Sequence, residues 1–265
     1  MRTGKIILLL ALGAMLASCA STGKTKIRIV QYNVGTFTHT DIPGGSLDMV
    51  VSMMKELKPD VMGLNEVDNY ARRTAEVDQL KEFAAGMGDW NYRFAPALDP
   101  FQGGQYGVGA CASGDFKLIR SDDIQLPRCK GREQRAMAVM EFDKLVFATT
   151  HIDFGDETQL TQLATINDYF DTYYAETGKP IFLTGDFNAR PDAPVIQEAL
   201  KTWRWISPEG NTYDSIQPDR CIDYVFVREN GVPVRVVCSE ICTEFDSGNV
   251  ANASDHLPVL VEVEF

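Results

Sequence analysis

The sequence predicts a layered α/β protein in which two packed β-sheets carry helices on their outer faces. Segments with the pattern of strands outnumber those with the pattern of helices, and helices fall between some strands but not others. From Lys26 onward the chain has no linker, repeat or low-complexity stretch. Its 265 residues, 45% hydrophobic and 23% charged, are enough for one large core. We therefore expect a single domain over residues 26–265, and the composition excludes a disordered, collagen-like or coiled-coil protein.

The first two elements show the two hydrophobic periodicities. Residues 26–32 predict a strand, because apolar side chains alternate with polar ones. Ser46 is a helix-capping residue, and the apolar stripe after it predicts a helix to about Leu57. Helical spacing predicts three further helices, at 77–87, 157–176 and 195–200. Short apolar runs predict the other strands, at 61–64, 90–97, 106–112, 116–118, 136–142, 144–150, 181–184, 222–227, 232–237 and 257–265.

The first residues have the pattern of a processing segment. Arg2 and Lys5 give a positive start, and residues 6–17 form an uninterrupted run of apolar or small residues. As a helix this run would cover only about 18 Å, which is short of the ~30 Å hydrocarbon core of a bilayer. The run therefore predicts a signal peptide over residues 1–18 rather than a permanent membrane span.

The block Leu16-Ala17-Ser18-Cys19 resembles a bacterial lipobox, in which the cysteine becomes the lipidated N-terminus. We therefore expect a membrane anchor at Cys19, followed by a polar tether over residues 19–25. The expected location is the bacterial cell envelope, at the outer membrane and facing the periplasm. The alternative is an ordinary secretory signal with an incidental cysteine.

The charge balance limits the partners. The chain has 25 Lys and Arg against 37 Asp and Glu, a net charge of −12. A broad basic surface that binds nucleic acid without sequence preference is therefore disfavoured, although a local basic groove stays open.

Export would place the cysteines in an oxidising compartment, where disulfides persist. Five cysteines follow Cys19, so at least one thiol is left unpaired. Cys238 and Cys242 cannot bond within one straight strand, because they would lie about 13 Å apart. No spacing typical of a zinc site occurs. The favoured interpretation is buried structural cysteines with one bridge, between Cys111 and Cys129.

Five segments at predicted strand ends carry polar residues that an alternating strand does not need. Active sites of layered α/β proteins are commonly built from such segments, so we expect all five to converge on one cleft. Two of the three histidines lie in them. The segments are Tyr32-Asn33-Val34-Gly35, Leu64-Asn65-Glu66-Val67-Asp68, Thr149-Thr150-His151-Ile152-Asp153, Leu183-Thr184-Gly185-Asp186-Phe187-Asn188-Ala189 and Ser254-Asp255-His256-Leu257-Pro258.

The ordered set QYNVG, NEVD, THID, GDFNA, IDYVF and SDHLPV resembles the endonuclease/exonuclease/phosphatase superfamily, from about Lys26 to Phe265. This superfamily includes exonuclease III-type and pancreatic-type deoxyribonucleases and neutral sphingomyelinases. The resemblance implies a four-layer α/β/β/α sandwich and a metal-dependent phosphoric ester hydrolase. It agrees with the fold class that the strand and helix patterns predict.

The resemblance also implies a metal site. Glu66 matches the principal Mg²⁺ ligand of the family, Asn33 would orient Glu66 or bind the metal indirectly, and Asp255 would add a carboxylate. Mg²⁺ keeps several waters and is usually held by one or two carboxylates, so this small ligand set is chemically reasonable. Mn²⁺ is the second candidate cofactor.

The catalytic residues carried over are His151, Asp186, Asn188, Asp223 and His256. Asp186 and Asn188 match the pair that positions or deprotonates the attacking water and donates to the phosphoryl oxygen. Asp223 would orient His256, which leaves the choice of general base open between Asp186 and His256. His151 matches a second histidine that contacts phosphoryl oxygens or the leaving group.

Two departures from the family pattern remove expected groups. Gly35 stands where related enzymes often have an acidic residue, and Ser113-Gly114 stand where an arginine often occurs. The remaining candidate substrate contacts are Arg72, Arg73, Arg135 and Arg190.

The sequence thus predicts an exported Mg²⁺-dependent phosphohydrolase that cleaves a phosphodiester or phosphomonoester by in-line attack of water. A small or lipid-derived substrate is favoured. One alternative is a nuclease acting on DNA or RNA, and another is a binding lipoprotein without catalysis. The oligomeric state is open, and a monomer is expected.

Overall fold

The computed structural model describes residues 24–39 and 45–265. The predicted signal peptide over residues 1–18 and the lipidation site Cys19 lie outside the described residues, as does most of the tether over 19–25. None of the helices in the described ranges has the length and apolar character that a membrane span needs.

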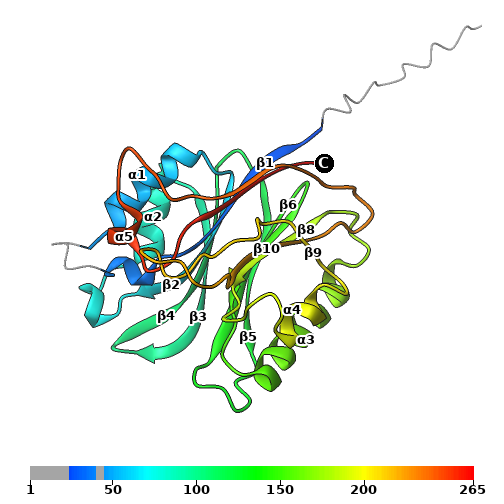
Figure 1. Cartoon of the computed structure of the whole chain (residues 1–265), viewed down its shortest axis with the longest axis horizontal. Helices are drawn as coiled ribbons and strands as arrows, with labels where there is room; N and C mark the ends of the chain where they lie inside the picture. The colour runs from blue at the N-terminus through cyan, green and yellow to red at the C-terminus, as the bar shows by residue number, and fades with distance from the viewer. Residues whose placement is uncertain (1–23, 40–44) are drawn as a thin grey trace, which may run out of the picture.

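Two six-stranded mixed sheets form the centre of the fold (Figure 1). The first has the order β11-β12-β1-β2-β4-β3 and the second the order β5-β6-β7-β8-β10-β9. The strands of the first sheet are β1 (Lys26–Asn33), β2 (Val61–Asn69), β3 (Asn91–Phe101), β4 (Gly104–Ala112), β11 (Arg235–Ile241) and β12 (Val259–Glu264). Those of the second are β5 (Leu118–Leu126), β6 (Arg135–Phe142), β7 (Val146–His151), β8 (Ile181–Asp186), β9 (Arg204–Trp205) and β10 (Asp223–Arg228).

Helices lie on the outer face of each sheet, so the predicted four-layer α/β/β/α sandwich is confirmed (Figure 1). The helices packed on the first sheet are α1 (Leu47–Leu57), α2 (Gln79–Gly88) and the short α5 (Val250–Ala253). Those on the second sheet are α3 (Asp156–Tyr174) and α4 (Pro194–Ala199). Two single-turn 3-10 helices complete the fold, η1 (Gly35–Phe37) and η2 (Arg72–Thr74).

The core between the sheets explains why the central strands have so few polar residues. Ile29 and Val261 of the first sheet pack in one cluster with Phe147 and Val225 of the second. Because the outer faces of these strands are covered by helices, both faces of each strand are buried and the sequence shows nearly continuous apolar runs. Most of the polar side chains of these strands lie where the strands leave the core, at the edge that holds the five polar segments.

The two sheets approach each other closely beside that edge. A Cβ atom on Gly63 of β2 would collide with Thr149 of β7 and Thr184 of β8 in the opposite sheet. Glycine is therefore required in the middle of this strand, since any side chain would push the sheets apart. The close approach brings the strand ends of both sheets within reach of one another.

Two expectations were wrong. Only Leu118 of the segment 116–118 lies in a strand, and the rest of that strand, β5, was missed because it is an exposed edge strand with few apolar residues. The Cys111–Cys129 bridge does not form: both thiols are free, Cys111 is buried under the helices of the first sheet, and Cys129 is exposed in a loop of the second. Cys221 and Cys242 are buried, as expected, whereas Cys238 is exposed, so the expectation of buried cysteines was wrong for that residue.

Candidate active site

Sheet topology brings the five polar segments to one edge of the sandwich. β1 runs parallel to β2, and β7 runs parallel to β8, so the carboxyl ends of each pair lie together. β12 is antiparallel to β1, and β10 is antiparallel to β8, so the amino ends of these two strands meet the same edge. Register then places Asp186 beside both His151 and Asp223.

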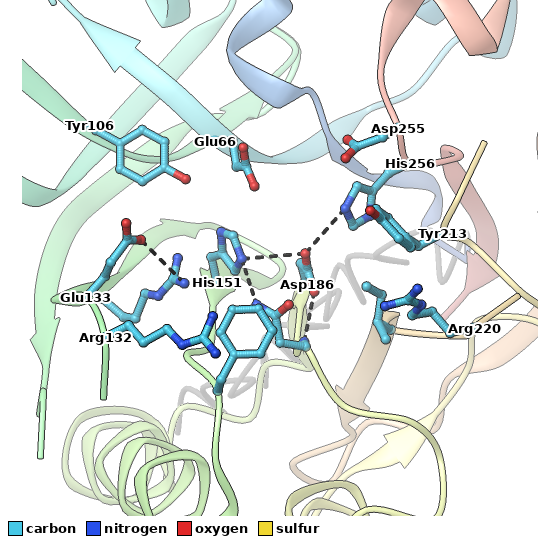
Figure 2. Close-up of a pocket in the computed structure, with 14 residues that line it drawn as sticks. Glu66, Tyr106, Arg132, Glu133, His151, Asp186, Tyr213, Arg220, Asp255 and His256 are labelled. Atoms are coloured by element: carbon cyan, nitrogen blue, oxygen red, sulfur yellow. Dashed lines mark hydrogen bonds and ion pairs between the residues drawn. The ribbon is translucent and has the colours of Figure 1, made fainter. Parts of the chain in front are cut away.

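A cavity of about 390 Å³ opens at this edge (Figure 2). Six of the eight predicted site residues line it: Glu66, His151, Asp186, Asn188, Asp255 and His256. The other two, Asn33 and Asp223, lie behind the lining and hydrogen-bond to it. The structure therefore brings all eight together.

The carboxylate of Asp186 lies at the centre of the site and is close to three other polar side chains (Figure 2). Its Oδ2 atom accepts a hydrogen bond from Nδ2 of Asn33 at 3.1 Å. The same oxygen lies 3.5 Å from Nε2 of His151 and 3.6 Å from Nε2 of His256. Burial, followed by the charge of Asp223, raises the pKa of Asp186 above its ordinary value.

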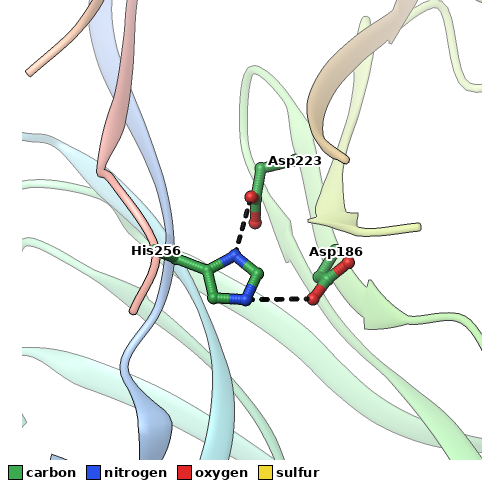
Figure 3. Close-up of side chains that lie close together, drawn as sticks. All are labelled: Asp186, Asp223 and His256. Carbon is green, nitrogen blue, oxygen red and sulfur yellow. Dashed lines mark hydrogen bonds and ion pairs between the residues drawn. The ribbon is translucent and has the colours of Figure 1, made fainter. Parts of the chain in front are cut away.

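His256 is held between two carboxylates (Figure 3). Its Nδ1 atom lies 2.9 Å from Oδ2 of Asp223, while Nε2 faces Asp186. Burial alone would lower the pKa of His256, but the charges of Asp223 and Asp186 outweigh it and raise the pKa. Thr212 donates to the same oxygen of Asp223 at 2.6 Å and fixes its orientation.

His151 is buried on the other side of Asp186. Burial, together with the positive charge of Arg135, lowers the pKa of His151 well below its ordinary value, which favours the neutral imidazole. The amide nitrogen of Asn188 donates to the carbonyl of Ile152 and lies 2.9 Å from Nε2 of His151. Since a carbonyl can only accept, the Ile152 contact fixes the amide orientation, and Nε2 of His151 is the acceptor.

Glu66 reaches the cavity through a β-bulge. The pairing of β2 with β4 skips one residue between Asn65 and Val67, and Glu66 has a φ of 59°. A non-glycine residue in this left-handed region costs roughly 1–2 kcal/mol. The bulge takes Glu66 out of the strand alternation and turns its carboxylate toward Nδ2 of Asn33, 3.2 Å away.

The carboxylates of Glu66 and Asp255 are suited to bind a hard divalent cation. Glu66 and Asp255 both line the cavity, and no Lys or Arg in the described ranges forms an ion pair with either. Burial raises the pKa of Glu66, partly offset by the Asn33 hydrogen bond, and the negative charge of Asp255 raises it further. A cation between the two carboxylates would offset the cost of burying Glu66 and the repulsion between Glu66 and Asp255. Mg²⁺ prefers oxygen ligands of this kind.

Asp186, Asp223 and His256 form a second group with the spacing of metal ligands, since their candidate ligand atoms lie within 4.8 Å of one another. Two of these atoms are already hydrogen-bonded to each other, Nδ1 of His256 and Oδ2 of Asp223. This group is therefore better suited to hold and move a proton.

Of the four arginines proposed as substrate contacts, only Arg135 lines the cavity. Arg73 forms a bidentate ion pair with Asp68. Arg190 donates to the backbone carbonyl of Asp219. Arg72 lies away from the cavity lining.

Several residues of the site were not singled out from the sequence. Asn65 accepts from the backbone N–H of Asp186 at 3.0 Å and donates to the carbonyl of Thr150, which ties the two sheets together beneath the site. In the sequence, Asn65 could have been recognised as a polar residue within a buried strand. Arg132, Tyr213 and Arg220 also line the cavity, but they lie in loops that show no periodic pattern.

Comparison with solved structures shows the same fold. An endonuclease/exonuclease/phosphatase from Bacteroides vulgatus is 20% identical, with a TM-score of 0.74 over 91% of this chain and 100% of that one. The mannosyl-6-phosphatase of Bacteroides thetaiotaomicron is 17% identical, with a TM-score of 0.75 over 90% and 100% of the two chains. ANGEL2, a 2′,3′-cyclic phosphatase, is 15% identical, with a TM-score of 0.69 over 91% and 95%.

No curated protein matches the sequence. The family model described as "Endonuclease/Exonuclease/phosphatase family" matches residues 30–256, which is most of the chain and contains every predicted site residue. With the sandwich fold and the converging motifs, this match shows that the chain belongs to the endonuclease/exonuclease/phosphatase family.

Proposed function

We propose that this protein is a Mg²⁺-dependent phosphoric ester hydrolase that acts on a small or lipid-derived phosphate ester by in-line attack of water. The observation that carries the proposal is the position of Asp186. Its carboxylate contacts His151, His256 and Asn33 at once, beside Glu66 and Asp255. Family members act on phosphoesters, and two structural neighbours are named as phosphatases.

Glu66 and Asp255 would hold the metal, and Asn33 would fix the Glu66 carboxylate. When bound, Mg²⁺, or Mn²⁺ in its place, supplies positive charge that offsets the charge on the phosphoryl group. The neighbouring group Asp186, Asp223 and His256 remains available for proton transfer.

Asp186 and His256 would activate the attacking water. Asp223 fixes the imidazole through Nδ1, so that Nε2 faces Asp186. Either group can accept a proton from the attacking water, and this exchange is assisted by the charge of the other group, whose facing atom lies 3.6 Å away. Burial of both side chains keeps this exchange away from bulk solvent.

Asn188, His151 and Arg135 would orient the substrate. Arg135 lines the cavity with its guanidinium near Glu133 and Asp153, so it can offer positive charge to a phosphoryl group. The amide of Asn188 is engaged by His151 and Ile152. Binding of the phosphoryl group would exchange the His151 contact of the amide for one to a phosphoryl oxygen, and His151 would donate to the substrate as the tautomer that carries its proton on Nε2.

The small cavity and the acidic surface favour a small substrate over long nucleic acid. The net charge of −12 repels a polyanion, and three of the four arginines considered as substrate contacts do not line the cavity. A nuclease is the alternative. We also propose that the protein is exported and anchored through Cys19, which would bring the site close to phospholipid head groups and to small phosphate esters in the periplasm.

The test is hydrolysis of 4-nitrophenyl phosphate and bis(4-nitrophenyl) phosphate with Mg²⁺, with and without EDTA, followed by sugar phosphates, phospholipids, RNA and plasmid DNA. The proposal expects EDTA-sensitive turnover of at least one small ester. Absence of turnover on every ester would indicate a binding protein. Activity on plasmid DNA alone would establish the nuclease alternative.

A further inference from the structure

The loop between β5 and β6 concentrates positive charge at the rim of the cavity. Residues 127–134 include Arg128, Lys130 and Arg132 but only one acid, Glu133. This composition contrasts with the net charge of −12 for the whole chain. Figure 2 shows Arg132 across the cavity from Glu66 and Asp255, with His151 and Asp186 between them.

Among the described residues, Arg132 and Arg128 lack the carboxylate partners that the other cations of this region have, and Arg128 donates instead to the backbone carbonyl of Arg132. Arg135 contacts Asp153 and Glu133, Lys130 pairs with Glu157, and Arg220 pairs with Asp219. Within the described part of the chain, Arg132 has no such carboxylate. Its guanidinium instead stacks over the ring of Phe154, with Cζ 4.9 Å from the ring centroid. The group is therefore held in place while its hydrogen-bond donors stay free.

The loop is also fixed on both sides of Arg132. The backbone N–H of Glu133 donates to Oδ2 of Asp153, which is fully buried, at 3.2 Å. On the other side, a Cβ atom on Gly131 would collide with the same carboxylate, so glycine allows the loop to approach it. Asp153 follows His151 at the end of β7, so the loop is attached directly to the catalytic edge. A cation positioned in this way loses little conformational entropy when it binds a ligand.

We propose that Arg132 and Phe154 form a subsite for a second phosphate group, carried on the alcohol part of the substrate. This inference rests on the proposed function and makes the substrate a small bisphosphorylated compound. The phosphoryl group to be cleaved would contact Asn188 and His151, and the second phosphate would bind the guanidinium of Arg132 at the rim. Phe154, with 45% of its surface exposed, holds the guanidinium and offers a ring edge to the carbon skeleton of the substrate.

The test compares fructose 1,6-bisphosphate with fructose 6-phosphate, measured as phosphate release with Mg²⁺ by the full domain. The wild-type protein is expected to show a higher kcat/KM for the bisphosphate. In Arg132→Gln, the ratio of the two kcat/KM values should fall by about tenfold, mainly through KM, because one charge-assisted contact is lost. Phe154→Leu should lower the same ratio by a smaller factor.

The matched control is Lys130→Gln, which removes the same charge from the same loop at a position that does not line the cavity. It should leave the ratio within about twofold, whereas an equal fall would show that only the general charge of the loop matters. A wild-type ratio of one or less, or an unchanged ratio in Arg132→Gln, overturns the subsite. Failure of the proposed function is a different result, since the wild-type protein would then also fail to hydrolyse 4-nitrophenyl phosphate.

Discussion

The Nδ1 atom of His256 lies 2.9 Å from Oδ2 of Asp223, and the Nε2 atom of the same ring faces Asp186 at 3.6 Å. The imidazole thus bridges two buried carboxylates that come from adjacent strands of the second sheet, while His256 itself precedes a strand of the first. This bridge across the sandwich makes the proton-handling groups one connected unit.

Asp223→Ala and His256→Ala should each lower kcat by roughly 10²–10⁴-fold, because each removes part of one proton-transfer unit. The double variant should be little worse than the poorer single variant, since residues that act together are not additive. Steady-state kinetics on a small phosphate ester provide the measurement. Fully additive losses in the double variant would show that the two residues act separately.

Thr212→Val should lower kcat by about tenfold while leaving KM nearly unchanged. The hydroxyl of Thr212 donates to the Asp223 oxygen that contacts His256, so its loss frees the carboxylate to rotate. Thr212→Ser keeps the hydroxyl and should restore most of the activity. If Ser and Val variants are equally impaired with equal thermal stability, the hydrogen bond does not position Asp223.

Glu66→Gln should lower activity by 100-fold or more and weaken Mg²⁺ binding, because a ligand matters more than the outer-shell groups whose loss costs about 10–100-fold. The fold should persist, since the side chain projects from a bulge into the cavity rather than into the core. Calorimetric titration with Mg²⁺ and circular dichroism test both parts. Glu198→Gln on α4 is the matched control, and an unchanged Mg²⁺ titration in Glu66→Gln would refute the ligand role.

Mg²⁺ should raise the thermal midpoint of the wild-type protein. A ligand that binds only the folded state stabilises it by about 2.7 kcal/mol at a concentration 100 times its Kd. Differential scanning fluorimetry with EDTA, Mg²⁺ and Mn²⁺ measures the effect, and Glu66→Gln should show little of it. An equal rise in both proteins would place the cation elsewhere.

Cys19→Ser should release the protein from the membrane fraction or leave it unprocessed. Each buried CH₂ of a lipid chain contributes about 0.8 kcal/mol to membrane binding, so the anchor controls partitioning. Cell fractionation with immunoblotting distinguishes the two forms. Identical membrane fractions for variant and wild type would contradict an anchor at Cys19.

The sequence alone determined the fold class, and it predicted the set of polar residues that the fold brings together at one edge. Strands buried on both faces appear as apolar runs, so a polar residue such as Asn33 or Asp186 at the end of a run stands out. Elements with clear periodicity were placed to within a few residues, as α1 and α3 show. The edge strand β5 was missed, because an exposed strand lacks the apolar run that indicates burial.

The tertiary structure alone decided how these residues are arranged and which loop residues join them. Glu66 reaches the cavity only because a bulge interrupts the pairing of β2 with β4, and pairing register is a property of two distant segments. Arg132 gains its position from Asp153, a residue 21 positions further along the chain, through backbone contacts at Gly131 and Glu133. Such contacts leave no periodic trace in the sequence, because they depend on how the sheets stack and not on the local order of residues.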